Sequence, residues 1–316
     1  MKKTAVILGN TNMGYSWFYL TYKQGLQRNG YTVTDIDYKT NSLDGIRGQL
    51  VSLKPRYVFT HLTFHQNINN IGSVLQMYRD VTKKTGTKFV HTCNDARVED
   101  RFMGDLSDVI YMAFVGTLDM LYNCMNAWNI PVFYAPYSCL CYDAPVAPAQ
   151  DLMFKEPVFT GGYGSHKDRK DFIDKLLKRI PIRIIATQSV ADLRHRTPEL
   201  SASAKCILGL CTGYDINGYI DVRPFQYMGT GACMILRKFK NMEAMIPEVC
   251  EKQHEKLYYP ITSYGNKGAD QLIDHWNRIQ KEDTTEMRLA AFTFMQKNHS
   301  CEVRLNYILE KLKHHG

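Results

Sequence analysis

Short apolar runs alternate with longer amphipathic stretches along most of this sequence. Residues 3–8 form a compact apolar run, and a glycine-containing turn follows it. Residues 17–29 then have the spacing of a helix that stops at Gly30, and residues 31–37 indicate a second strand. A strand, a glycine turn, a helix and a strand in this order open a doubly wound sheet. The predicted fold class is therefore α/β.

The alternation continues to about residue 135 and then begins again. Before the break we predict strands at 57–61, 88–92, 109–113 and 131–135 and helices at 70–82 and 117–128. Residues 137–156, with prolines among small residues, have the composition of a linker. Beyond the linker we predict strands at 158–160, 182–186, 206–210 and 232–236 and helices at 170–179, 197–204, 222–228, 242–246, 268–280, 285–296 and 301–313.

This restart predicts two Rossmann-like, doubly wound domains that face a cleft, with a helical C-terminus. We expect an N-terminal domain at 1–145, a C-terminal domain at 146–296, and a final helix at 297–316 that packs back towards the N-terminal domain. A chain of 316 residues is long for one core and sufficient for two domains.

The composition is that of a soluble globular protein, with 45% hydrophobic and 22% charged residues, which excludes disordered and fibrous classes. Lys and Arg number 39 against 31 for Asp and Glu, which gives a net charge of +8. The excess is spread along both halves and forms no block. It allows a polyanionic partner such as DNA, or a small phosphate-bearing ligand, and requires neither.

The nine cysteines are scattered, and several lie in apolar runs. This pattern predicts free thiols in a reducing compartment, hence a cytoplasmic protein (in the host cytoplasm if the chain is viral). His91 and Cys93 have no second ligand pair at zinc spacing, so we predict no metal site. No segment approaches the roughly 18 apolar residues of a membrane span, and residues 5–8 are too short for the core of a signal peptide.

The loop after the first strand, Gly9 to Gly14, has two glycines of the dinucleotide fingerprint G-x-G-x-x-G. Thr11 stands where the middle glycine belongs, and its side chain obstructs close approach of a pyrophosphate. Asp37 ends the second strand, where a ribose-binding carboxylate is expected. An NAD-dependent oxidoreductase is thus an alternative function. Asp35 and Asp37 also form an Asp-x-Asp pair that is a weaker hint of a metal.

Two further loops follow predicted strands and carry candidate proton acceptors. His65 lies in the first of these loops and Asp95 in the second. Either side chain, facing a cleft, would be able to take a proton from an attacking hydroxyl. The alternative is that neither residue is catalytic. Asp95 would then stabilise an Asx-turn, in which Asp is common, and His65 would be solvated.

The second half contains two candidate anion-binding segments. Gly161 to Arg169 follows the first strand of that half, and its glycines permit close backbone approach. Lys167 and Arg169 add positive charge at a helix start, where cations are unusual unless an anion binds there. In the other segment Arg223 stands near the start of a short helix, and the turn Gly229-Thr230-Gly231 precedes an apolar strand. We expect that guanidinium and the glycine-turn amides to bind a phosphate.

These two segments, residues 161–169 and 223–236, resemble the nucleotide-sugar-binding half of two-domain (GT-B) glycosyltransferases. They are most similar to the spore-maturation-protein-like group, related to group 1 glycosyl transferases, which includes bacteriophage members. Residues 258–264 and the last helices lie where that pattern has a Tyr-x-Ser-like segment and a C-terminal helix. The likeness covers about residues 150–310, and the N-terminal half only in outline. One departure is Gln226, where the family usually has a Glu that holds the nucleotide ribose.

The resemblance implies an enzyme that moves a hexosyl or pentosyl unit from a nucleotide diphosphate sugar, UDP-linked, to a hydroxyl acceptor without a metal or other cofactor. A hydroxymethylated base of phage DNA is one possible acceptor. Asp95 or His65 would be the catalytic residue, and Asn12, Asn94 and Arg97 would lie on the acceptor side. The resemblance implies donor binding by Gly162, Tyr163, Lys167, Arg169, Arg223, Gln226, Gly229, Thr230 and Gly231. The sequence leaves the oligomeric state open between a monomer and a homodimer. It also leaves open a non-catalytic protein that binds a sugar nucleotide.

Overall fold

The computed structural model describes residues 3–9, 17–60, 71–93, 107–164, 166–185, 196–212, 215–216, 219, 221–240 and 256–315. The chain divides into two compact units. The first contains residues 1–137 and 301–316, and the second contains residues 138–300. The sequence-based limits at 145 and 296 fall a few residues from these boundaries. Within the described residues, no helix has the length and apolar character needed to cross a membrane.

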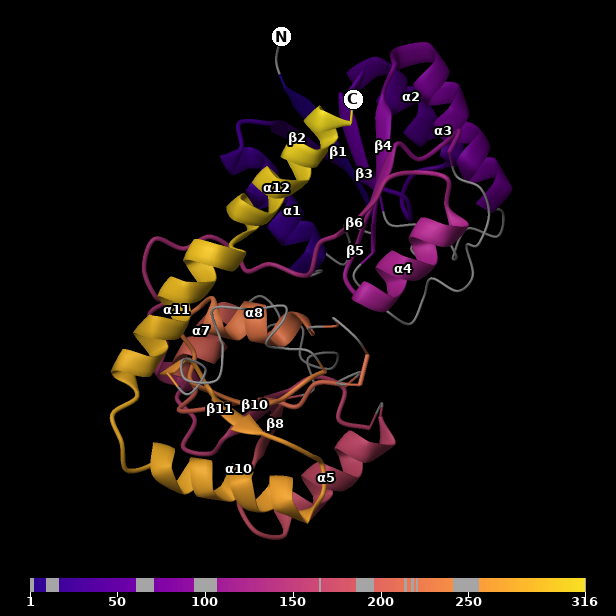
Figure 1. The fold of residues 1–316 in the computed structure, drawn as a ribbon. Helices are drawn as coiled ribbons and strands as arrows, with labels where there is room; N and C mark the ends of the chain where they lie inside the picture. Colours follow the sequence, from indigo (N-terminus) through magenta and orange to yellow (C-terminus); the bar gives the residue numbers. More distant parts are fainter. Residues whose placement is uncertain are drawn as a thin grey trace. The chain divides into compact units, whose positions relative to one another are not determined.

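The described part of the first unit contains a six-stranded parallel sheet in the order β2-β1-β3-β4-β5-β6 (Figure 1). Helices α2, α3 and α4 cover one face of it, and helices α1 and α12 cover the other. The elements are β1 (Thr4–Gly9), α1 (Trp17–Arg28), β2 (Thr32–Asp37), α2 (Leu43–Leu53), β3 (Tyr57–Thr60), α3 (Ile71–Thr85), β4 (Lys88–Cys93), β5 (Met112–Val115), α4 (Leu118–Ala127), β6 (Val132–Tyr134) and α12 (Cys301–His314).

Helix α12 comes from the end of the chain and completes the core of the first unit. Its apolar side, with Leu305 and Leu309, packs with Ile7 of β1 and Leu26 of α1. The two helices cross at Gly25, where an added Cβ would lie 2.5 Å from the carbonyl oxygen of Cys301. Only a residue without a side chain allows the helices to approach this closely.

The described part of the second unit contains a five-stranded parallel sheet in the order β11-β10-β9-β7-β8. Helices α5 and α10 share a core with one face, and α7, α8 and α11 lie on the other side (Figure 1). The elements are η4 (Gln150–Leu152), β7 (Val158–Thr160), α5 (Lys167–Leu177), β8 (Arg183–Ile185), α7 (Thr197–Ser203), β9 (Ile207–Gly209), α8 (Val222–Met228), β10 (Met234–Arg237), β11 (Tyr259–Ile261), α10 (Asn266–Ile279) and α11 (Thr285–His299).

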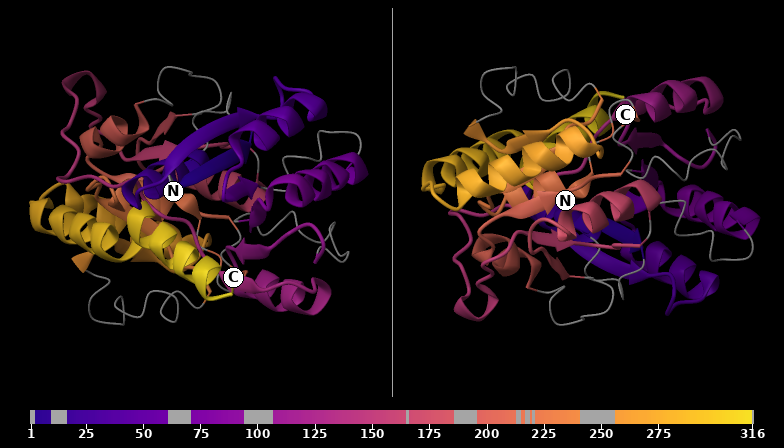
Figure 2. Two further views of the ribbon diagram at one scale, coloured as in Figure 1. Left: turned by 90° about the horizontal axis from the view of Figure 1, so that it is seen from above. Right: turned by 90° about the horizontal axis from the view of Figure 1, so that it is seen from below.

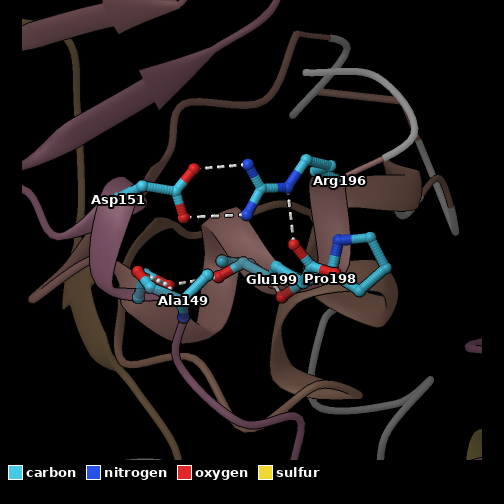
Figure 3. Close-up of polar contacts among 7 residues, drawn as sticks. Ala149, Asp151, Arg196, Pro198 and Glu199 are labelled. Atoms are coloured by element: carbon cyan, nitrogen blue, oxygen red, sulfur yellow. Dashed lines mark hydrogen bonds and ion pairs between the residues drawn. The ribbon is translucent and has the colours of Figure 1, made fainter. Parts of the chain in front are cut away.

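The segment expected to be a linker is fixed to the second unit by polar contacts around Arg196. The Arg196 guanidinium binds the Asp151 carboxylate through two nitrogens, at 2.5 and 2.9 Å, and Glu199 through Nε at 2.7 Å (Figure 3). The Ala149 N–H donates to Ser203 Oγ at 2.7 Å. Bidentate binding of this kind is specific in geometry as well as in charge. Residues 149–151 are therefore held against α7.

The predicted fold class is confirmed, and individual elements need correction. The strand expected at 109–113 lies at Met112–Val115, because Val109 and Ile110 are buried in the turn before it. Sequence reasoning missed α2 and β11. Helix α2 is capped by Ser42, whose hydroxyl accepts from the Gly45 N–H at 3.1 Å. The helix expected at 242–246 lies outside the described residues.

Candidate anion-binding site

The winding of the second sheet changes direction between β7 and β9, and we call the region outside the carboxyl ends of these two strands the crevice. The chain leaves β7 towards β8 on one side and leaves β9 towards β10 on the other. The two strands pair at a single position, Val158 with Ile207. In sheets wound in this way, ligands bind outside the carboxyl ends of the two strands whose connections diverge. The loops after β7 and β9 border this position.

Arg223, in the first turn of α8, is held at the carboxyl end of β7. Its Nε donates to the carbonyl oxygen of Thr160, the last residue of β7, at 3.3 Å. Its Nη1 pairs with the carboxylate of Asp221, which also caps α8 by accepting from the Arg223 N–H at 3.2 Å. The Arg223 side chain is 18% exposed and that of Asp221 is 8% exposed. The guanidinium is therefore fixed in the crevice with part of its surface open.

Gly161 makes room for this guanidinium. Its φ of +121° is a conformation that side-chain-bearing residues rarely adopt, and an added Cβ would lie 2.5 Å from Arg223 Nη2. The Gly161 N–H is used by the Ile185 carbonyl of β8, at 3.1 Å. Among the described residues no acceptor takes a hydrogen from Nη2, whereas Nε and Nη1 bind Thr160 and Asp221.

Two more arginines surround the same crevice, and we call Arg169, Arg223 and Arg237 the arginine cluster. Arg169, on α5, is 2% exposed, and its Nη2 donates to the Gly162 carbonyl at 2.5 Å. Arg237 ends β10, and its guanidinium carbon lies 5.3 Å from the centre of the Tyr264 ring. The Tyr264 hydroxyl donates to the Cys211 carbonyl at 2.5 Å, beyond β9.

The pKa shifts show that these charges act on one another. Burial and the neighbouring charge of Arg223 lower the pKa of Arg169. Burial, the largest single influence, lowers the pKa of Arg223, but the Asp221 carboxylate together with Tyr227, Cys211 and Tyr219 raises that pKa overall. Burial raises the pKa of the Tyr264 hydroxyl, whereas all three arginines act to lower it. Within the described part of the chain, three guanidinium groups thus stand against the carboxylate of Asp221, an arrangement that attracts an anion.

The remaining residues that we predicted to bind the donor lie in the loop after β7 and on helices α5 and α8. Gly162 and Tyr163 are partly buried, and Lys170 Nζ lies 5.4 Å from the Tyr163 ring centre. Lys167 is exposed at the start of α5. Gln226 is partly buried on α8, one turn after Arg223, and residues with this spacing are neighbours on a helix.

Gly229, Thr230 and Gly231 lie at the other end of α8. Their N–H groups donate to the carbonyls of Phe225, Tyr227 and Met228, at 3.0, 3.2 and 3.0 Å. The turn is buried, and it leads into the amino-terminal end of β10, whereas Arg223 lies at the carboxyl edge of the sheet. The structure gives these residues a role in ending the helix. We leave them out of the anion site, because their amides already have acceptors.

The candidate catalytic residues Asp95 and His65 and the acceptor-side residues Asn12, Asn94 and Arg97 lie outside the described residues. Asp37, the expected NAD ribose ligand, is buried, and its carboxylate accepts from the Lys39 N–H at 2.7 Å. Asp35 pairs with Lys23 at 2.5 Å. Neither carboxylate belongs to a group of three or more metal-ligating side chains within the part of the chain that the structure describes.

Sequence reasoning missed three members of this site, namely Asp221, Arg237 and Tyr264. Asp221 had a usable signal, because an Asp two residues before an Arg at a helix start is well placed to cap the helix and bind the Arg. Arg237 follows an apolar run, and so a strand end was foreseeable. Tyr264 had no local signal, since it reaches the site only through the pairing of β10 with β11.

No protein-family model matches this sequence, and no curated protein matches it either. Solved structures do resemble the fold. A glycosyltransferase from Rickettsia africae ESF-5 is 13% identical with a TM-score of 0.60, over 99% of this chain and 98% of that one. An O-GlcNAc transferase mutant from Thermobaculum terrenum is 9% identical with a TM-score of 0.53, over 98% of this chain and 67% of that one. At these identities the likeness concerns the fold. The chain therefore has the two-sheet α/β fold of GT-B glycosyltransferases.

Proposed function

We propose that this protein is a glycosyltransferase that uses a nucleoside diphosphate sugar, UDP-linked, as its donor. The observation that carries the proposal is the Arg223 guanidinium. It is held at the carboxyl end of β7 by Thr160 and Asp221, with Nη2 so close to Gly161 that an added Cβ would lie 2.5 Å from it. The fold shared with glycosyltransferases supports the same function. The sequence likeness of residues 150–310 supports the finer assignment to the spore-maturation-protein-like group.

The donor diphosphate would bind against Arg223, with Lys167 and the Gly161–Gly162 backbone beside it. Arg169 is almost fully buried, so it would act through its charge and by supporting the loop at Gly162. Gln226, one turn along α8, would bind the ribose hydroxyls. The arginine cluster would supply the positive charge that a divalent cation supplies in other transferases, so we propose a reaction without a metal.

In the proposed reaction an acceptor hydroxyl oxygen forms a bond to the anomeric carbon. The bond from that carbon to the diphosphate oxygen breaks, and the nucleoside diphosphate leaves with the electron pair. Arg223 would stabilise the negative charge that develops on the diphosphate as this bond breaks. The proton of the acceptor goes to a base, for which Asp95 and His65 are the candidates. A hydroxymethylated base of DNA is one acceptor to test.

The test is a thermal-unfolding panel with UDP, GDP, ADP, their sugars and NAD⁺. A ligand at 100 times its Kd should add about 2.7 kcal/mol to the free energy of unfolding. We expect UDP and a UDP-sugar to raise the unfolding temperature. A shift with NAD⁺ alone would instead favour the oxidoreductase alternative. Binding of UDP-sugar without release of UDP, when acceptors are supplied, would identify a non-catalytic binding protein.

Arg223→Ala should weaken UDP binding by about 1.5–3 kcal/mol, the scale of a hydrogen bond to a charged group. This change leaves the buried Asp221 carboxylate unpaired. The double variant Arg223→Ala/Asp221→Asn therefore serves as a second test, because Asn removes the charge and still caps the helix. Arg179→Ala is the matched control, since Arg179 is exposed on the turn after α5 and pairs with Asp270 at 2.7 Å. Equal UDP affinity in the Arg223 and Arg179 variants would refute the assignment.

A further inference from the structure

The fold gathers at one place the cations that are scattered in the sequence. Every strand of the first sheet is parallel, so each segment that leads into a strand reaches the same, amino-terminal edge. Strand β1 begins and α12 ends at this end of the unit (Figures 1 and 2). We use the name basic edge for the cations that the described residues place there: Lys3, Lys54, Arg56, Lys83, Lys84, Lys88, Lys311 and Lys313.

Among the residues that the structure describes, few acidic side chains balance the basic edge. Asp108 and Glu302 lie near it, but they pair with other arginines, Arg79 at 2.6 Å and Arg28 at 3.7 Å. Glu310 is the further acidic residue that the described part of α12 brings close. Eight cations that are scattered along the sequence thus lie at one edge of the first unit.

Three of these cations are held on tyrosine rings along neighbouring strands. Lys3 Nζ lies 5.8 Å from the Tyr31 ring centre, the Arg56 guanidinium 5.3 Å from that of Tyr57, and Lys88 Nζ 3.9 Å from that of Tyr111. Such cation–π contacts hold the three charges near the ends of their strands.

The helix dipole explains only part of the basic edge. Lys83, Lys84, Lys311 and Lys313 lie in the last turns of α3 and α12, where cations are favourable in any protein. Lys3, Arg56 and Lys88 lie at strand starts, outside the last turns of the helices. Their charges add to those of the helix ends, so that the edge as a whole attracts an anionic ligand.

We propose that the basic edge docks this protein on an anionic phospholipid surface. Clusters of lysines bind such surfaces as point charges. Leu53, which is 42% exposed and precedes Lys54, adds an apolar contact within the same edge. A nucleic acid fits less well, because Tyr31 and Tyr57 are 7% and 1% exposed under their cations, and bases cannot stack on buried rings.

This docking is independent of the proposed transferase activity. The basic edge lies at the opposite ends of the strands from the carboxyl edge, where ligands of such sheets bind. A protein docked in this way keeps the ligand edge of its first sheet away from the lipid.

The experiment is co-sedimentation of the full chain with vesicles of phosphatidylcholine containing phosphatidylglycerol, and with vesicles of phosphatidylcholine alone. We expect binding to the anionic vesicles only, with release by salt. The variant Lys54→Gln/Lys84→Gln/Lys313→Gln removes exposed cations from three elements of the basic edge. Because each lysine near such a surface contributes about fivefold, it should lower the partition coefficient about 100-fold.

The matched control is Lys155→Gln/Lys178→Gln/Lys281→Gln, which removes the same charge from exposed positions of the second unit. The control should bind as the wild type does, and Arg at the three basic-edge positions should restore binding. Equal loss in both Gln variants would mean that only net charge matters and would overturn the proposal. Absence of binding to anionic vesicles would also overturn the proposal. So would binding to a DNA duplex, instead of the vesicles, that is lost in the basic-edge variant.

Discussion

At the scale of single residues, the candidate site depends on how closely a glycine and an arginine approach each other. Gly161 and Arg223 are 62 positions apart in the sequence, and the guanidinium fills the space where a side chain of residue 161 would be. Both residues were predicted from the sequence as anion-binding candidates. Their contact was not, because it depends on β7 and α8 meeting at the same edge of the sheet.

Gly161→Ala should weaken UDP binding and destabilise the protein together. The new Cβ would displace Arg223 Nη2, and the backbone at φ +121° would hold an unfavourable conformation that costs about 1–3 kcal/mol. Urea unfolding and calorimetric titration with UDP measure the two effects. Gly164→Ala is the control, since an added Cβ there meets nothing within 4 Å. If both alanine variants bind UDP as the wild type does, Gly161 has no part in the site.

Gln226→Glu should strengthen UDP binding. A carboxylate accepts from ribose hydroxyls in charge-assisted bonds that are about twice as strong as neutral ones. We expect a gain of about 1 kcal/mol, or roughly fivefold in Kd. Inorganic pyrophosphate, which has no ribose, should gain nothing from the substitution. A gain for pyrophosphate, or none for UDP, would contradict the placement of the ribose at Gln226.

At the scale of elements, the chain was predictable where local signals agree with the fold. Both ends of helix α8 were predicted to the residue, because Asp221 precedes its first residue and Gly229 follows its last. Helix α2 was missed, since two glycines, at positions 45 and 48, weaken its helical pattern. The role of the Gly229–Gly231 turn was beyond local reasoning. A glycine turn before a strand has the same sequence whether it binds phosphate or only ends a helix.

Two glycine-to-alanine changes within helices should act in opposite directions. Gly48→Ala in α2 should raise the free energy of unfolding by about 0.5–1 kcal/mol, because an added Cβ there contacts nothing and alanine favours a helix. Gly25→Ala in α1 should lower it by about 1–3 kcal/mol, because the Cβ would meet the Cys301 carbonyl and Leu305 of α12. Urea unfolding of both variants measures the difference. Equal effects would contradict the close crossing of α1 and α12.

At the scale of the whole molecule, the α/β class and the repeat of one winding pattern were readable from the apolar runs. The position of the charges was not. The sequence spreads its lysines and arginines along both halves, and parallel winding brings those of the basic edge together. Parallel strands also bring Arg223, Arg237 and Tyr264 together from separate loops, so no linear motif contains the site.

The buried tyrosines make the folded protein sensitive to alkali. Burial raises the pKa of Tyr22 and Tyr78 well above the usual 10.0 and that of Tyr259 to about 12. The folded state therefore holds these protons more tightly than the unfolded state. The contribution to stability is complete below about pH 10 and is lost as the pH rises towards 12. Urea midpoints should fall over this range, with a cooperative rise in absorbance at 295 nm. Titration of every tyrosine near pH 10 without unfolding would contradict this.

The place of α12 also has a consequence for biosynthesis. A ribosome finishes residues 138–300 before it makes the helix that covers Tyr22 and Leu26 of the first unit. The earlier-made half therefore waits with part of an apolar sheet face uncovered while the later-made half is already complete. A nascent chain of this protein should consequently depend on holdase chaperones for its first half until translation ends.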